Sequence, residues 1–573
     1  MHKQLWELDA DNFINNETPF HLGFLVTESS HPYTKTLSKT IQENTADGIS
    51  QLLSVDSDIS KAFSLCHNNP ELQILKEEIT KSVIEENRII FSGCGSTGRL
   101  SILFESMWRK GCIRLTDKLN KTEENSKLAE LLKKSASNVR GIITGGDRAL
   151  IKSVENFEDY QEFGRQQVRE LDLNPGDVFI AISEGGETSS VIGTAHEALN
   201  NNCTTFFIFN NPLDLLCKKI ERSKILIENS KITTIDLTTG PMSIAGSTRM
   251  QATTMELLTI GSVLEISLQN ILQKTNLTDV CTLQTLKDYS TSFNSLLHSL
   301  QDDKSIKILA SVVEFEEQIY TKKEMIIYTI NDFLLDIFTD TTERTPTFST
   351  PALKSTFAKE DPSPWAAALQ PQMNTKATWL EMIGREPVGL DWDSKLYNIL
   401  GSPELEKNPP SLGKEEIYSY KIGSEGFEVY NNNKLTHIEI VILDATSRKS
   451  KIEEQNFCSS KLRLIISDAN SNSTYLDKNT LELKIPDTPL RLFTHIAAKL
   501  VFNTISTGTM ARSGRIQGNW MVEVTPSNKK LIDRSIRIIS DLKSLSYREA
   551  AYMVFREIYK NPNDLSSLVA RLL

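Results

Sequence analysis

The sequence predicts an α/β protein that holds two copies of a doubly wound, mostly parallel sheet, with helical segments at both ends. Three observations predict it. Short β-branched runs alternate with helical stretches, the order of these runs occurs twice, and two glycine-rich stretches each directly follow such a run. The 573 residues are too many for one ordinary core, and a hydrophobic fraction of 39% is enough to fill more than one.

The N-terminal part is expected to be a helical arm. Up to about residue 87 the chain is polar, with apolar residues recurring at helical spacing through 49–53, 59–63 and 72–79. We predict that this arm comprises residues 1–87.

A first α/β cycle is expected from residue 88. Its strands are predicted at 88–91, 141–143, 177–182, 205–209 and 231–235, and a long amphipathic helix follows at 249–268. Such alternation is typical of parallel strands joined by right-handed helical crossovers. The predicted domain is 88–275.

A second cycle repeats this order. Its strands are predicted at 324–328, 437–442, 463–466 and 481–485, and an apolar helix closes it at 492–510. We expect a second domain at 276–527, with an insertion at 352–417, and a C-terminal helical segment at 528–573. The insertion holds Trp365, Trp379 and Trp392, which would line the site or, more commonly, form a small satellite core.

Two loops of the first copy carry the residues of a phosphate site. Gly93-Cys94-Gly95-Ser96-Thr97-Gly98 and Ser183-Glu184-Gly185-Gly186-Glu187-Thr188 combine glycines with short hydroxyls after predicted strands. The second copy has Thr329-Ile330-Asn331-Asp332-Phe333-Leu334 and Asp444-Ala445-Thr446-Ser447-Arg448-Lys449 instead. The sequence therefore predicts one phosphate site per chain, and a phosphorylated small molecule is the first ligand to consider.

The first loop also matches the dinucleotide fingerprint, and Asp117 lies near the distance expected for a ribose contact. A single match of this kind is weak. Ser96 and Thr97 suit direct phosphate contact, and a nicotinamide site does not need the second loop. Dinucleotide binding stays a minor alternative, as does a purely structural role of the glycines in tight turns.

Charge and composition exclude several classes of protein. With 63 Lys and Arg against 74 Asp and Glu, a net charge of -11 argues against general binding to nucleic acid or to an anionic membrane. No secretory core or membrane-spanning run is recognised, and seven scattered cysteines suit reduced thiols, so we expect a soluble, cytoplasmic protein. No cluster of ligands suggests a metal, and no cofactor is expected.

A wider set of motifs resembles the sugar isomerase (SIS) type. These are Gly145-Gly146-Asp147-Arg148-Ala149-Leu150, Val154 to Asp159, Thr239-Gly240-Pro241 with Gly246 to Met250, and Asn503 to Gly508 with Gly514 to Val522. They resemble the N-acetylmuramic acid 6-phosphate etherases, bacterial homodimers of single SIS domains. A double-SIS chain with these motifs is similar to the glucokinase regulatory proteins, as is the stretch from Thr27 to Pro32. The resemblance covers most of the chain.

The resemblance implies two catalytic carboxylates. Glu158 matches one of them. The other normally lies on the helix after the first glycine loop, where copy one has Met107, but Glu343-Arg344-Thr345-Pro346-Thr347 of copy two resembles its motif. A pseudo-dimer within one chain would therefore present Glu343 across the interface to the first copy. An ordinary surface position is the usual fate of Glu, and only the motifs single these two out.

The resemblance also implies the binding residues. Gly95, Ser96, Thr97, Ser183, Gly186 and Thr188 would hold the phosphate, and Ser247, Thr248 and Arg515 would bind the remaining oxygens. Ser247 and Thr248 would equally serve as a helix N-cap, and Arg515 as a solvated charge. Met242, Gln251 and Arg515 depart from the etherase pattern, which usually has Glu, Lys and Lys there.

The function that the resemblance implies is elimination of lactate from N-acetylmuramic acid 6-phosphate followed by addition of water. One carboxyl would remove the ring proton and the other would protonate the departing oxygen. By analogy Glu343 is the acid and Glu158 the base, although the sequence does not fix which is which.

Two other functions stay open. A regulator would bind a fructose phosphate in the same cradle and dock on a sugar kinase. We rank it second because the vertebrate regulators continue into a longer helical lid than residues 528–573 supply. An aldose-ketose isomerase would call for a ring-opening His or a comparable acid and base. None of the eight histidines lies within the matched motifs that carry site residues, and we rank this function below the other two.

Overall fold

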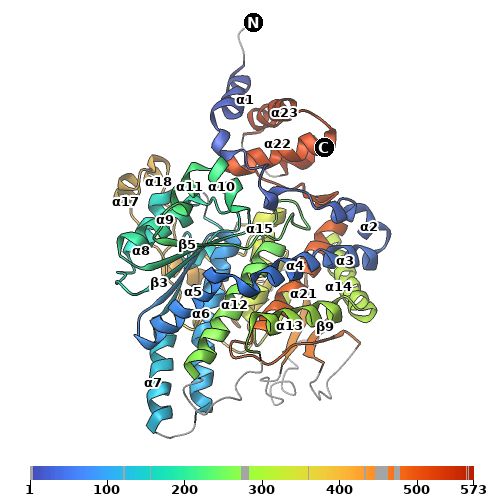
Figure 1. Cartoon of the computed structure of the whole chain (residues 1–573). Helices are drawn as coiled ribbons and strands as arrows, with labels where there is room; N and C mark the ends of the chain where they lie inside the picture. The colour runs from blue at the N-terminus through green and yellow to red at the C-terminus, as the bar shows by residue number, and fades with distance from the viewer. Residues whose placement is uncertain are drawn as a thin grey trace.

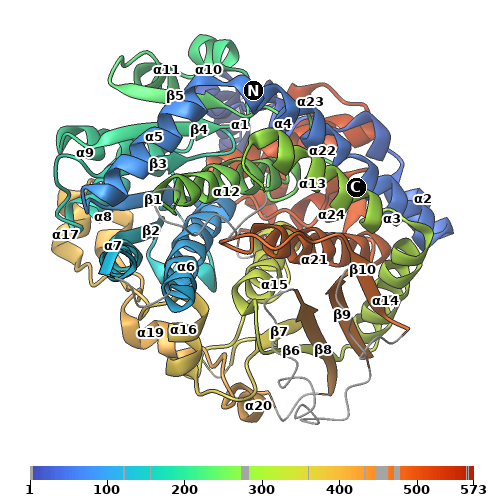
Figure 2. The same ribbon diagram turned by 60° about the horizontal axis from the view of Figure 1, so that its bottom comes forward.

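The computed structural model describes most of the chain, namely residues 4–119, 123–154, 156–272, 283–358, 360–430, 434–444, 462–469, 478–562, 564–565 and 567–573. Two five-stranded sheets lie on either side of a group of long helices (Figure 2). The predicted α/β class and its duplication are confirmed.

The first sheet holds β1 (Ile89–Gly93), β2 (Val139–Ile143), β3 (Val178–Ile182), β4 (Thr204–Phe209) and β5 (Ile232–Asp236). All neighbouring strands are parallel, in the order β2-β1-β3-β4-β5. β1 and β3 are buried along their whole length, as their apolar runs predict. Because the order reverses between β1 and β3, the loops after these strands meet at one edge, where open α/β sheets bind ligands.

The second sheet repeats this topology. It holds β6 (Met325–Ile330), β7 (Ala366–Leu369), β8 (Leu435–Leu443), β9 (Leu462–Asp468) and β10 (Thr480–Leu483), in the order β7-β6-β8-β9-β10. β7, the counterpart of β2, was not predicted. Its sequence Ala-Ala-Ala-Leu lacks β-branched residues, and it lies inside the segment 352–417 that the sequence interpretation treated as an insertion.

Helices flank the first sheet and connect its strands: α5 (Pro70–Ile84), α6 (Gly95–Lys118), α7 (Glu123–Asn138), η5 (Asp147–Leu150), α8 (Gln161–Arg169), α9 (Ser189–Asn200), α10 (Leu213–Lys219), α11 (Glu221–Ile227) and α12 (Gln251–Leu272). The helices of the second half are α13 (Leu286–Leu300), α14 (Asp303–Thr321), α15 (Leu334–Phe348), α16 (Thr375–Ile383), α17 (Ser394–Ile399), α18 (Pro403–Lys407), α19 (Lys414–Ser419), α20 (Gly426–Val429) and α21 (Leu492–Arg512).

Four helices form the central contact between the halves. α12 packs against α6 and α21, and α15 packs against α6 and α21 (Figure 2). α12 is long and apolar enough to cross a membrane, but 94% of its apolar 18-residue stretch is buried inside the protein. Its composition is therefore explained by its place in the core.

The two ends of the chain form a cap beside the first sheet (Figure 1). The N-terminal helices are α1 (Leu5–Asn16), η1 (Thr18–Phe20), η2 (Val26–Glu28), η3 (Pro32–Thr34), α2 (Leu37–Glu43), α3 (Thr45–Ser54), α4 (Ser57–Leu65) and η4 (Cys66–Asn68). The C-terminal ones are α22 (Lys529–Lys543), α23 (Tyr547–Lys560) and α24 (Leu568–Leu572), after the short strands β11 (Ile516–Gln517) and β12 (Trp520–Met521). α1 packs on α23. The buried carboxylate of Glu28 pairs with Arg534 and Arg537 of α22, each at 2.6 Å.

The segment around Trp392 packs against the first half. Trp392 joins Phe157, Phe163 and Tyr397 in a separate aromatic cluster. Trp379 is buried against Phe338 of α15. For Trp392 and Trp379 the structure shows core positions, and the Trp392 cluster supports the loop that carries Glu158.

Candidate functional site

The loop between β1 and α6 is a tight turn with free space at its tip. A Cβ atom on Gly93 would lie 2.3 Å from the Thr97 carbonyl carbon, so only glycine allows this approach. Gly95 adopts φ +56°, and a Cβ atom there would meet nothing within 4 Å. Ser96 is half-buried, whereas the Thr97 hydroxyl is used inside the turn, where it accepts from the Cys94 amide at 3.0 Å. The open side of the loop therefore belongs to Gly95 and Ser96.

The second predicted loop follows β3, the neighbour of β1. Gly186 has φ +70°, and the Ser183 hydroxyl donates to that of Thr188 at 3.1 Å. The sheet order thus brings Gly95, Ser96, Ser183, Gly186 and Thr188 to one edge, as predicted for a phosphate cradle. Ligation by these residues stays a prediction.

The start of α22 lies against this second loop. Lys530 Nζ is 3.0 Å from Oε1 of Glu187, and Arg222 Nη2 is 2.7 Å from its Oε2. Burial alone would raise the pKa of Glu187, but these two cations outweigh it and lower the pKa. The negative charge that Glu187 adds to the cradle is therefore balanced by α11 and α22.

Glu158 lies on the other side of Lys530. The Asn528 side chain donates to its Oε1 at 2.8 Å. Burial raises the pKa of Glu158, with Lys530 opposing the shift. Burial also raises the pKa of Cys94 in the first loop, and the charge of Glu158 adds to that shift. Glu158 is therefore held near the first loop, under a C-terminal segment whose involvement the sequence interpretation did not foresee.

Glu343 opens into a pocket between the two halves. Its wall includes Ser96 of the first loop, and it is lined by Ser96, Arg99, Leu100, Leu103, Arg249, Thr253, Leu257, Asp336, Thr339, Asp340, Glu343, Lys499 and Asn503. Glu343 is 6% exposed, and among the described residues no donor lies within hydrogen-bonding distance of its carboxylate. The structure thus brings Glu343 of the second half and Ser96 of the first half to one pocket.

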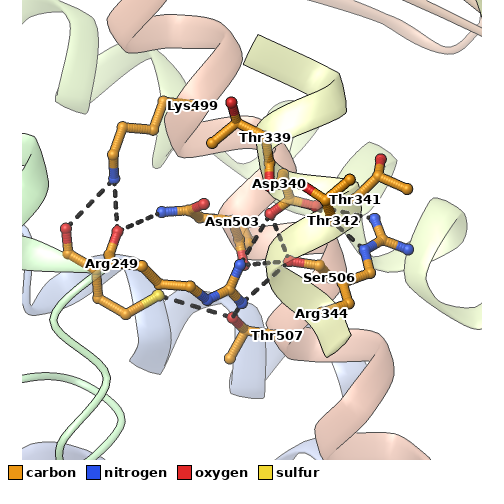
Figure 3. Close-up of polar contacts among 12 residues, drawn as sticks. Arg249, Thr339, Asp340, Thr341, Thr342, Arg344, Lys499, Asn503, Ser506 and Thr507 are labelled. Carbon is orange, nitrogen blue, oxygen red and sulfur yellow. Dashed lines mark hydrogen bonds and ion pairs between the residues drawn. The ribbon is translucent and has the colours of Figure 1, made fainter. Parts of the chain in front are cut away.

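A buried ionic network fixes the helix that carries Glu343 (Figure 3). Arg249, just before α12, pairs with Asp340 of α15 at 3.0 Å, and both side chains are 3% exposed. Asp340 also accepts from Arg344 at 3.0 Å and from Ser506 of α21 at 2.8 Å. One carboxylate therefore ties α15 and α21 of the second half to the segment just before α12 of the first half.

Lys499 of α21 completes this wall (Figure 3). Its ammonium donates to the Arg249 carbonyl at 2.8 Å and to the Thr254 hydroxyl at 2.7 Å. Burial lowers the pKa of Lys499 to about 8, with Glu343 opposing the shift. Lys499, Arg249 and Asp340 were not among the predicted site residues, because their proximity arises only when the halves pack.

Glu184 is a further carboxylate that the sequence interpretation did not single out. It is buried, accepts from the Thr253 hydroxyl at 3.0 Å, and burial raises its pKa to about 7. The nearby charge of Glu343 adds to this shift. The available signal was the presence of two acidic residues, Glu184 and Glu187, inside a phosphate-type loop.

The remaining predicted residues lie as follows. Ser247 is buried and Thr248 half-buried directly before α12, and the Thr248 carbonyl accepts from the Thr253 amide at 3.1 Å. Arg515 contacts other groups than the cradle loops: it donates to the Phe348 carbonyl and lies over the Trp365 ring at 4.4 Å. These contacts give no support to a role of Arg515 in binding a sugar, nor do they fit a freely solvated charge.

The second half fills the corresponding edge with its own side chains. Arg491 lies over the ring of Phe333 at 4.1 Å and pairs with Asp332 at 3.0 Å and Asp444 at 2.6 Å. Of the second loop in this copy, residues 445–449 lie outside the described residues. Where it is described, this edge carries an internal ion-pair network and borders a second pocket, whose lining includes Met107, Arg114, Phe333 and Arg491.

The chain is similar to one family model and to curated relatives. The family model of the glucokinase regulatory protein N-terminal SIS domain matches residues 72–199. The chain is 29% identical over 252 residues to the N-acetylmuramic acid 6-phosphate etherase of Pasteurella multocida, which is 43% of this chain and 72% of that protein. It is 27% identical over 243 residues to the etherase of Clostridium acetobutylicum, 42% of this chain and 68% of that protein.

The chain also resembles several solved structures. Among solved structures, it is similar to the C-terminal domain of glucosamine-fructose-6-phosphate aminotransferase from Francisella tularensis, with TM-score 0.42, 12% identity and coverage of 80% of this chain and 96% of that chain. Tagatose-6-phosphate ketose/aldose isomerase from Escherichia coli gives TM-score 0.38 at 11% identity, with coverage of 81% and 92%.

Proposed function

We propose that the chain is a sugar-phosphate-binding lyase that releases D-lactate from N-acetylmuramic acid 6-phosphate and gives N-acetylglucosamine 6-phosphate. The observation that carries the proposal is the shared pocket of Glu343 and Ser96, which belong to different halves. The etherases named above support the reaction class. The proposed ligand is a phosphorylated amino sugar, with no nucleic acid or membrane partner, and the proposed location is the cytoplasm.

The proposed roles follow from position and charge. Gly95 and Ser96 would hold the phosphate together with the second loop, and Glu343 would act as acid on the departing lactyl oxygen. Glu158 would act as base. Burial raises its pKa, which makes its carboxylate a stronger base than that of a free Glu. Glu184, with a pKa of about 7, is a second candidate for proton exchange in this region.

The test is release of D-lactate from N-acetylmuramic acid 6-phosphate by the purified chain. Glu343→Gln and Glu158→Gln should each slow the release by about 100-fold or more, because each removes one proton-transfer group. Glu381→Gln is the matched control, since Glu381 is an exposed carboxylate of the second half. Absence of lactate from the unaltered chain would exclude the etherase proposal.

A second candidate is a regulator that senses a fructose phosphate and binds a sugar kinase. The match to the glucokinase regulatory protein model favours it, as does α22, which lies over the cradle where a ligand would alter its contacts. Inhibition of a sugar kinase that strengthens with fructose 6-phosphate, without lactate release, would establish this function instead.

The division of the chain at 87, 275 and 527 is part of the proposal. Limited proteolysis followed by mass spectrometry would test these boundaries. Cleavage should concentrate near them if the units fold independently.

A further inference from the structure

Arg99 is a buried cation with unused hydrogen-bond donors. It lies in the first turn of α6, lines the pocket that holds Glu343, and is 2% exposed. Its Nη1 donates to the Gly95 carbonyl at 3.3 Å, but among the described residues neither Nε nor Nη2 has a hydrogen-bond partner. No carboxylate of the described chain forms an ion pair with it within 4 Å. A buried cation with two unpaired donors is costly, so its presence calls for an explanation.

The two unused donors form one edge of the guanidinium. The N–H bonds of Nε and Nη2 point the same way, and their spacing matches the two oxygens of a carboxylate. This side-on fork recognises planar anions in a way that an ammonium does not. The free edge of Arg99 therefore fits the paired oxygens of a carboxylate or of a phosphate, and the rest of the pocket decides between them.

The rest of the pocket suits a small, branched acid. Leu100, Leu103 and Leu257 form an apolar wall, and the ammonium of Lys499 adds a second cation. Glu343 lies close enough to oppose the lowering of the Arg99 pKa that burial causes. A carboxylate on Arg99 would thus sit beside the group proposed to protonate the departing oxygen.

We propose that Arg99 binds the carboxylate of the lactyl substituent and thereby selects the lactyl ether of the amino sugar phosphate over the same sugar without it. This inference rests on the proposed function for the identity of the acid. It assigns Arg99 to substrate recognition, with the methyl group of the lactyl unit against the leucine wall. Because both nitrogens are shielded, a neighbouring side chain of the pocket has to move when the acid binds.

The experiment is calorimetric titration with two ligands, N-acetylmuramic acid 6-phosphate and N-acetylglucosamine 6-phosphate. All variants are made in a Glu158→Gln background to suppress turnover. Arg99→Lys keeps the charge and removes the fork, so it should weaken binding of the lactyl ether by about 10- to 100-fold. Binding of N-acetylglucosamine 6-phosphate should change by less than about 2-fold, because that ligand has no carboxylate.

Arg114→Lys is the matched control on the same helix. Arg114 lines the second pocket, beside Phe333 and Arg491, and donates to the Pro489 carbonyl. This change should therefore leave both affinities unaltered. An equal loss for both ligands in Arg99→Lys would overturn the inference and assign Arg99 to the phosphate. No loss for either ligand would also overturn it.

A stability measurement separates recognition from folding. Arg99→Met removes a buried cation with unsatisfied donors, so the melting temperature without added ligand should stay equal or rise. A fall of several degrees would assign Arg99 a structural role and overturn the inference. If the chain prefers the lactyl ether through Arg99 but releases no lactate, only the proposed reaction fails. If lactate is released without dependence on Arg99, only this inference fails.

Discussion

The loops after β1 and β6 occupy the same place in two copies of one sheet and are used differently. After β1, Gly95 leaves open space and Arg99 keeps an unused donor edge. After β6, Phe333 and Asp332 take up Arg491 of the same chain. The comparison shows how a duplicated fold can keep an open edge in one copy and convert the other into internal structure.

The second copy still contributes to the first. Its α15 carries Glu343 into the pocket with Ser96, and Asp340 one turn earlier binds Arg249 of the first half. Although the second copy has lost its glycine cradle, its α15 still supplies residues to the pocket of the first copy.

The largest effect is expected from moving the carboxylate between the copies. Glu343→Met should lower lactate release by at least about 100-fold, because the acid is lost. Adding Met107→Glu should not restore it, since Met107 lines the second pocket with Phe333 and Arg491, where the loop after β6 has no glycine cradle. Lactate release from the purified double variant is the measurement. Recovery of activity would mean that the second copy retains a working cradle.

Asp340 should be the most sensitive position for stability. Asp340→Asn leaves the buried Arg249 and Arg344 without their shared carboxylate and should lower the free energy of unfolding by about 3–5 kcal/mol. If Met107 and Glu343 correspond, the counterpart in the first copy is Phe104, which is fully buried. Phe104→Leu should cost about 1 kcal/mol. Similar losses in urea unfolding of the two variants would contradict the asymmetry.

The buried acids predict a pH dependence. The pKa of Glu184 is about 7 in the fold against 4.5 for a free Glu, so the folded chain binds more protons between these values and the free energy of unfolding falls as pH rises. Asp56 and Glu265 have raised pKa values and act with the same sign. Glu184→Gln should flatten the fall by at most about 3 kcal/mol between pH 4.5 and 7. Urea unfolding at several pH values would measure this dependence. If the free energy of unfolding falls equally with pH in the unaltered chain and in Glu184→Gln, the raised pKa of Glu184 is refuted.

Gly95→Ala should have the smallest effect. Its Cβ atom meets open space, so only the left-handed backbone disfavours it, by about 1 kcal/mol in unfolding. Affinity for the sugar phosphate should also fall, because the methyl group enters the cradle. Phe333 holds φ +60° in the second copy without being glycine, so this conformation alone does not require glycine. A more stable Gly95→Ala variant would show that the open loop is not left-handed in solution.

Much of the fold could be predicted because local patterns carry it. The apolar runs of β1, β3, β4 and β6 and the helices α12 and α21 were found near their observed bounds. β7 was missed because three alanines give no strand pattern, and its pairing with β6 rests on packing. Motifs singled out the two glycine loops, Glu158 and Glu343 as predicted site residues. The positions of Lys530, Lys499 and Arg99 relative to them could not be predicted from the sequence.

The sequence by itself determined the duplicated α/β architecture, the glycine loops of one copy and the motif around Glu343, because strand, helix and turn preferences are local. Only the tertiary structure decided that Glu343 meets Ser96, that Lys530 neutralises Glu187, and that Arg99 is buried with an unused fork. These relations join residues hundreds of positions apart. They depend on how the two halves and the two chain ends pack. Packing buries these groups and brings charges together, and both effects shift their pKa values.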